Sequence, residues 1–234
     1  MNTQPERQRV FDIRSAPSIT NAAGYFAELA KVLHRIPHDT IDQITARLAR
    51  AYEENKTVFL FGNGGSAALA SHAACDLGKG TAVRGKRRFP VIALTDNIPV
   101  MTAWANDSCY DDIFAEQLLN FVKNDDVVLA ISGSGNSPNV LKGLKAAREA
   151  GAFTIGLTGY EGGKMKALCD LCLVVPCDNM QFIEDLHSCV AHSIFTGLRA
   201  LIKISQTSVP AVQIAAHRRE PSPTVIAPPS IAEA

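Results

Sequence analysis

Four side chains in this sequence have the types and the spacing to move a proton or to hold a metal ion. His72 and Asp76 are four residues apart in one segment of helical pattern, and Glu184 and His192 are eight apart in another. Residues spaced by four lie on one face of a helix, so each segment presents a carboxylate and an imidazole on a single stripe. Such a set lets a carboxylate act as general base and a histidine as general acid.

Two other interpretations of these four residues are open. Two carboxylates and two neutral imidazoles also suit zinc or another divalent cation, because such ions bind nitrogen and oxygen donors of this kind. Alternatively, the residues form ordinary exposed helix pairs, each of which stabilises its helix by only about 0.2–0.5 kcal/mol. The motifs that surround the four residues favour a chemical role.

Two turns rich in glycine and serine each follow an apolar run and open a helical pattern. They are residues 62–66, Gly-Asn-Gly-Gly-Ser, and residues 132–137, Ser-Gly-Ser-Gly-Asn-Ser. Glycines let backbone N–H groups approach an anion, hydroxyls add donors, and a helix N-terminus adds partial positive charge. Neither turn has the Gly-Lys-Ser/Thr of a P-loop or the Gly-x-Gly-x-x-Gly of a dinucleotide site. We therefore predict a site for a phosphorylated small molecule.

Short apolar runs alternate with helical patterns through most of the chain. Runs that are apolar on both faces are typical of parallel strands covered by helices. We predict an α/β fold, a three-layer sandwich in which a five-stranded parallel, flavodoxin-like sheet is flanked by helices, with two more helices on the N-terminal side. Ligands bind beyond the carboxyl ends of such strands, where both turns lie. The strands are expected at residues 58–61, 90–94, 127–131, 153–157 and 171–175, and the helices at 18–35, 39–55, 66–77, 98–105, 111–123, 137–150, 162–168 and 180–204.

Composition excludes several other classes of function. The 234 residues carry 23 basic and 23 acidic side chains, so we expect neither nucleic acid nor an anionic membrane surface as the main partner. No apolar stretch approaches the roughly 20 residues that span a bilayer, and we expect a cytoplasmic protein. Residues 1–16 and the Pro/Ala/Ser-rich segment 205–234 are expected to be disordered.

Five short blocks follow one another in a fixed order along the chain. They are residues 61–68, 105–107, 131–137, 157–163 and 184–187. Each block alone is a weak signal, whereas their combination is specific. Together they resemble the sugar isomerase (SIS) domain in its single-domain phosphoheptose isomerase branch, and we assign residues 17–204 to such a domain.

The resemblance implies an aldose–ketose isomerase that interconverts sedoheptulose 7-phosphate and D-glycero-D-manno-heptose 7-phosphate through an enediol. It also implies a homotetramer with active sites between subunits, and Zn²⁺ in some members. The family's base falls on Asp76 and its acid on His192, and zinc-binding members place ligands at His72, Asp76, Glu184 and His192. The sugar phosphate is then contacted by polar residues and glycines, namely Asn63, Gly64, Gly65, Ser66, Asn106, Asp107, Ser132, Gly133, Ser134, Ser137 and Glu184.

Three positions depart from the family pattern. Gly133 replaces a common Thr, which removes one hydroxyl but leaves the backbone N–H. Asp76 replaces Glu and is one methylene shorter, and a misplacement of about 1 Å can cost about 100-fold in rate. Glu184 stands where Gln is frequent, which adds negative charge and favours a metal site.

Related chains of the same fold suggest two non-catalytic alternatives. One is a tetrameric adaptor that binds a replication-initiation protein, and the other is a sensor that binds a sugar phosphate without turnover. The adaptors lack the base, whereas Asp76 and His192 are both present here. We therefore favour the isomerase.

Overall fold

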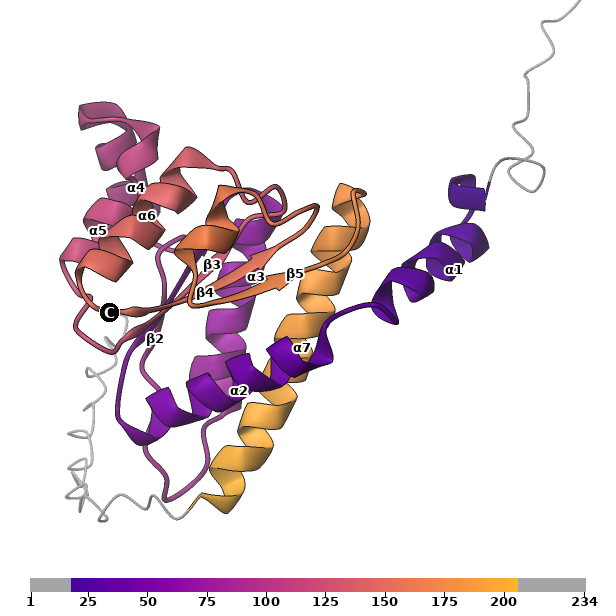
Figure 1. Ribbon diagram of the computed structural model, residues 1–234. Coiled ribbons are helices and arrows are strands. Elements are labelled where there is room, and N and C mark those ends of the chain that lie inside the picture. Colours follow the sequence, from indigo (N-terminus) through magenta and orange to yellow (C-terminus); the bar gives the residue numbers. More distant parts are fainter. Residues whose placement is uncertain (1–17, 206–234) are drawn as a thin grey trace, which may run out of the picture.

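The chain folds around one parallel sheet of five strands, which a computed structural model describes together with the rest of residues 18–205 (Figure 1). The strand order is β2-β1-β3-β4-β5, and every neighbouring pair is parallel. This arrangement confirms the predicted α/β fold. The disorder predicted for residues 1–16 and 205–234 concerns segments outside the described residues, apart from Ser205. The strands are β1 (Val58–Gly62), β2 (Val91–Ala93), β3 (Val127–Ile131), β4 (Phe153–Thr158) and β5 (Leu171–Val174).

Helices lie on both faces of the sheet, as Figure 1 shows. The first two precede the sheet in sequence, and most of the others connect successive strands. Short 3-10 turns occur at Ser18–Thr20, Tyr110–Asp112 and Lys164–Leu168. The α-helices are α1 (Ala22–Leu33), α2 (His38–Glu53), α3 (Gly65–Cys75), α4 (Ile98–Asp107), α5 (Ala115–Leu119), α6 (Pro138–Glu149) and α7 (Met180–Ile204).

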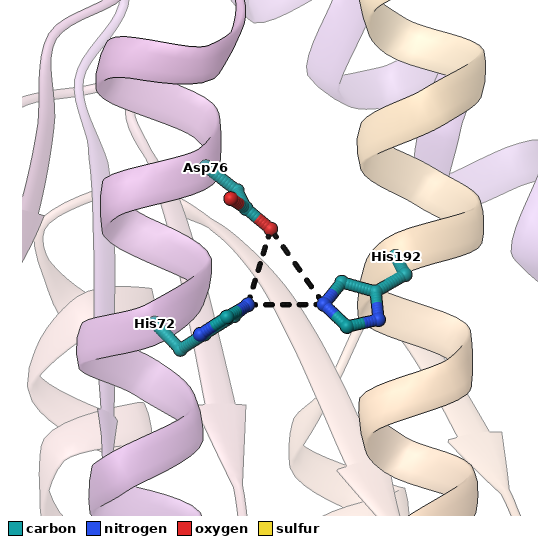
Figure 2. Close-up of side chains that lie close together, drawn as sticks. All are labelled: His72, Asp76 and His192. Carbon is teal, nitrogen blue, oxygen red and sulfur yellow. Dashed lines mark hydrogen bonds and ion pairs between the residues drawn. The ribbon is translucent and has the colours of Figure 1, made fainter.

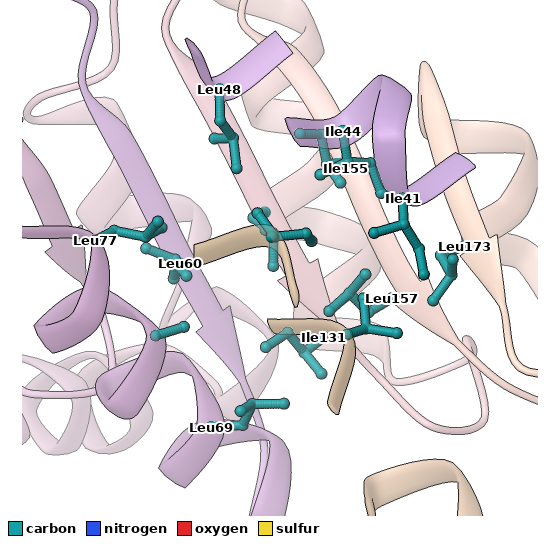
Figure 3. Packing of buried hydrophobic residues seen from close by; sticks show 14 of the residues in the cluster. Ile41, Ile44, Leu48, Leu60, Leu69, Leu77, Ile131, Ile155, Leu157 and Leu173 are labelled. Atoms are coloured by element: carbon teal, nitrogen blue, oxygen red, sulfur yellow. The ribbon is translucent and has the colours of Figure 1, made fainter. Parts of the chain in front are cut away.

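The apolar strands divide their side chains between two cores. Alternate residues of β1 point to opposite faces, so Leu60 packs in one cluster while Phe59 and Phe61 pack in the other. The larger cluster joins the sheet to α2, α3 and α7, and Figure 3 shows Leu48, Leu69 and other members within it. The smaller cluster lies under α5 and α6. Burial on both faces explains why the strands read as continuous apolar runs.

Four helical predictions differ from the structure. The helix expected at 162–168 forms only the 3-10 turn Lys164–Leu168, because Gly162 and Gly163 have φ of +93° and +55°, outside the right-handed helical region. The helix expected at 18–35 begins only at Ala22, because the Asn21 side chain accepts a hydrogen bond from Gly24 N and caps it there (2.9 Å). The pattern at 111–123 forms a 3-10 turn and then the short α5. The helix expected to end at residue 77 changes at Asp76 into a π-helical turn, Asp76–Gly80. None of the helices in residues 18–205 combines the length and apolar character that crossing a membrane requires.

Candidate active site

The loop after β3 forms a small polar cavity at the carboxyl edge of the sheet. Its backbone turns through a hydrogen bond from Gly135 N to Ser132 O (3.0 Å), and the hydroxyls of Ser132 and Ser137 lie 3.3 Å apart. Gly135 has φ +64°, and a Cβ there would overlap Gly162 O, so only glycine fits. The cavity measures about 150 Å³ and is lined by Asn63, Ser66, Ile131, Ser132, Gly133, Ser134, Ser137, Met180 and Glu184.

The turn after β1 forms the opposite side of this cavity. Gly64 has φ +54° and precedes the first residue of α3, so backbone N–H groups at the start of that helix face the same edge of the sheet. The Asn63 amide is held by a reciprocal pair of hydrogen bonds with the Asn139 amide (2.9 and 2.8 Å). Tyr110 also donates to Asn63 Oδ1 (3.2 Å). The loop positions predicted at Asn63, Ser66, Ser132, Gly133, Ser134 and Ser137 therefore do line one cavity.

Glu184 lies beside the first turn of α3. A Cβ on Gly65 would come within 2.8 Å of Glu184 Oε1, so the absence of a side chain at residue 65 allows this approach. A carboxylate is stabilised at the positive end of a helix. Glu184 lines the loop cavity and a neighbouring cavity of about 210 Å³ that Gly65, Leu69, Asp185 and Ser188 help to form.

His72 on α3, Asp76 at the start of the π-helical turn that follows α3, and His192 on α7 lie close together (Figure 2). Asp76 Oδ2 lies 3.3 Å from His72 Nε2 and 3.8 Å from His192 Nε2. The two Nε2 atoms are 3.0 Å apart, so when both rings are neutral, one of them donates and the other accepts. The side chains of His72 and His192 are 55% and 56% exposed, so the group is open to a ligand on one side.

This group fits a divalent cation. Two ligands of a tetrahedral zinc lie about 3.3 Å from one another when each bond is about 2.0–2.1 Å. The three separations in the structure, 3.0, 3.3 and 3.8 Å, lie on either side of that value. Two imidazoles and a carboxylate also match the catalytic type of zinc site, which keeps one position open.

Glu184 does not join this cluster, contrary to the prediction of a fourth ligand. Glu184 and His192 share a face of α7, but eight residues separate them by about 12 Å along the helix. The cluster of potential metal ligands in the described residues therefore contains His72, Asp76 and His192 without Glu184.

Asn106 and Asp107 also lie apart from the loop cavity of the described chain. They end α4, are exposed, and hydrogen-bond to one another through Asn106 Nδ2 and Asp107 Oδ1 (2.8 Å). Sequence reasoning missed Asn139 and Met180, although Asn139 follows the second Gly/Ser turn by only two residues. Met180 occupies the space next to Gly133, where a Cβ would lie 2.5 Å from its sulfur.

Comparison with known proteins identifies the family to which this fold belongs. A model of the SIS domain matches residues 24–159. A phosphoheptose isomerase from Rhodospirillum rubrum is 46% identical over 135 residues, which are 58% of this chain and 71% of the relative. One from Aliarcobacter butzleri is 39% identical over 166 residues, 71% of this chain and 87% of the relative. The chain belongs to the SIS-domain family.

The fold of this SIS-domain protein is also similar to that of a solved phosphoheptose isomerase. The phosphoheptose isomerase of Neisseria gonorrhoeae is 30% identical to it with a TM-score of 0.71, and the match covers 76% of this chain and 96% of that one. The resemblance inferred from the five sequence blocks is thus confirmed. The matched residues 24–159 contain the two Gly/Ser turns and α3, the helix that bears His72.

Proposed function

We propose that this SIS-domain protein is an aldose–ketose isomerase that converts sedoheptulose 7-phosphate to D-glycero-D-manno-heptose 7-phosphate. The observation that carries the proposal is the meeting of Asp76 and His192, which come from helices 116 positions apart in sequence (192 minus 76) and lie 3.8 Å from one another. Relatives named phosphoheptose isomerase support the choice of reaction and substrate.

The Ser132–Ser137 loop would bind the phosphate. Ser132, Ser134 and Ser137 line the cavity together with Glu184, and the adjoining helix N-termini add positive charge. The position of Glu184 gives the distance between the phosphate loop and the His/Asp cluster. Glu184 lines the loop cavity and lies about 12 Å before His192 along α7. An open seven-carbon chain extends on the order of 10 Å from phosphorus to C1 at ordinary bond lengths of about 1.5 Å. A heptose phosphate therefore has the length to span the two regions.

Proton transfer would then proceed through an enediol. Asp76 removes a proton from C1 of the ketose, while His192 donates a proton to the carbonyl oxygen at C2. The enediol returns a proton from its C1 hydroxyl to the imidazole, and the carboxyl group of Asp76 protonates C2 to give the aldose. His72, 3.3 Å from Asp76, would hold the carboxylate in place between the two steps.

We propose Zn²⁺ as a cofactor held by His72, Asp76 and His192, whose donor atoms all lie within 4.8 Å of one another. When bound, such an ion would stabilise the negative charge on the sugar oxygen in place of the His192 proton, because a ring nitrogen that binds zinc has no proton to donate.

We further propose a homotetramer in the cytoplasm with active sites between subunits. Helix α1 extends away from the body of the chain (Figure 1), and Phe26 and Leu33 on it are 65% and 42% exposed. Such side chains favour burial against a partner. Asn106 and Asp107 do not line the loop cavity of the described chain. In the proposed tetramer they would contact the sugar in the active site of another subunit.

Turnover of sedoheptulose 7-phosphate, followed by proton NMR, tests the proposal. We expect the aldose to appear with wild-type protein, and Asp76→Asn and His192→Asn to reduce kcat by about 10²–10⁴-fold, as loss of a general base or acid does. Both variants should still be stabilised thermally by the sugar phosphate, because the loop is intact. Binding without turnover in the wild type, with and without added zinc, would instead support a sensor, and capture of a replication initiator would support an adaptor.

A further inference from the structure

His187 is a buried polar residue on α7 that the proposed reaction does not use. Its side chain is 1% exposed, inside the core between α7 and the carboxyl end of β4. The ring Nε2 lies 3.1 Å from the carbonyl oxygen of Thr158. A carbonyl oxygen only accepts hydrogen bonds, so Nε2 carries the proton and donates it.

The opposite ring nitrogen has no partner among the described residues. Nδ1 of His187 is buried and unpaired, and an unsatisfied acceptor of this kind destabilises the folded state. Thr158 O already accepts a hydrogen bond from Val175 N (2.8 Å), so this carbonyl does not depend on the imidazole. A leucine would fill the same space without an orphaned nitrogen. Packing alone therefore does not favour a histidine here. The hydrogen bond from its Nε2 to Thr158 O needs another explanation.

Thr158 connects His187 to the phosphate loop. Its hydroxyl donates to Gly133 O (3.3 Å), and Gly159 N donates to the same oxygen (2.9 Å). Gly133 lies in the loop cavity between Ser132 and Ser134. A continuous set of hydrogen bonds thus joins the helix that bears His192 to the backbone of the loop.

We infer that His187 is a positioning residue that holds the Ser132–Ser137 loop in its anion-binding arrangement through Thr158 and Gly133. The inference rests on the proposed function, because it assigns the loop to the phosphate of the substrate. Without the imidazole N–H, Thr158 at the end of β4 loses one of the two hydrogen bonds to its carbonyl, so its hydroxyl holds Gly133 O less firmly and the loop spends less time in the competent arrangement. Apparent affinity falls in proportion to that fraction.

The test compares His187→Leu, which removes the donor, with His187→Gln, whose amide can still donate to Thr158 O. We expect His187→Leu to raise both KM for the sugar phosphate and the inhibition constant of inorganic phosphate about tenfold. Its kcat should stay within about twofold, because the Asp76–His192 pair is unchanged. His187→Gln should restore both constants to within about threefold of the wild type.

Val190→Ala is the matched control for loss of packing. Val190 is 2% exposed on the same helix but does not contact Thr158 through a hydrogen bond, so this variant should lose stability without weaker phosphate binding. Equal inhibition constants for His187→Leu and wild type would overturn the inference, and so would an equal weakening in Val190→Ala.

A second variant covers the case in which His187→Leu does not fold. Thr158→Val keeps the shape of the side chain and removes only the hydrogen bond to Gly133 O, so phosphate should bind about threefold more weakly. Unchanged binding in that variant contradicts the inference. If the wild type turns over no sugar phosphate, the proposed isomerase fails. Calorimetric titration of the same variants with inorganic phosphate then still decides the role of His187.

Discussion

Lowering the pH from about 7.5 to about 5 is expected to weaken the folded state through His187. Burial lowers the pKa of this imidazole from 6.5 to about 4, while the hydrogen bond to Thr158 O only partly opposes the shift. At pH 5 the unfolded chain binds a proton at residue 187 and the folded chain does not. Stability therefore falls as the pH drops below 6.5, and the loss is complete below about pH 4.

The size of this effect follows from the two pKa values. One pKa unit corresponds to about 1.4 kcal/mol, so the difference between 6.5 and about 4 gives a limit of about 3.4 kcal/mol. At pH 5 the loss should reach about 2 kcal/mol. With a urea m value of about 2 kcal/mol/M, the unfolding midpoint would fall by about 1 M.

The assay is urea unfolding of wild type and His187→Gln at both pH values, followed by circular dichroism in the presence of a chelator. Glutamine does not titrate, so the variant should lose about 2 kcal/mol less than the wild type on acidification. All other titrating groups are common to the two proteins and cancel in this comparison. An equal loss in both proteins would refute the assignment of a neutral, buried imidazole.

Three further predictions concern the loop and the cluster. Replacing Gly135 by Ala should destabilise the loop and weaken phosphate binding at least about tenfold, because the backbone is left-handed and the new Cβ would overlap Gly162 O; phosphate titration measures this. His72→Ala should abolish the binding of one zinc ion per chain, whereas Glu184→Gln should retain it. Metal analysis after dialysis measures both. Loss of zinc from both variants would show that Glu184 is also a ligand. Gly133→Ala should lower the melting temperature, and adding Met180→Ala should recover part of the loss, because the new Cβ would lie 2.5 Å from the Met180 sulfur.

Apolar runs made the sheet predictable from sequence. Every expected strand formed within one or two residues of its predicted bounds, and α7 covers Met180–Ile204 as predicted. A long amphipathic stripe determines the extent of that helix, and the Asn179 cap determines where it begins. The π-helical turn at Asp76 could not be predicted, because a change in backbone hydrogen bonding leaves no mark on side-chain periodicity.

The site was predictable only in part. Spacing by four correctly placed His72 and Asp76 together, and the fold brought His192 to them. The same spacing placed Glu184 and His192 on one face of α7, but the prediction overlooked that eight residues of helix separate them by about 12 Å along the axis. The reciprocal amide pair of Asn63 and Asn139 depends on the packing of two loops 76 residues apart, which no local pattern contains.

Deuterium incorporation during turnover tests the central claim most directly. Wild-type protein is incubated with sedoheptulose 7-phosphate in D₂O, and the aldose formed is analysed by proton NMR. In the proposed reaction, Asp76 takes a proton from C1 and returns one to C2 through an enediol, and its side chain is 26% exposed, so the bound proton can exchange with solvent between the two steps. Part of the aldose will then carry deuterium at C2. Aldose formed without deuterium at C2, or formed at an undiminished rate by Asp76→Asn, would contradict the account.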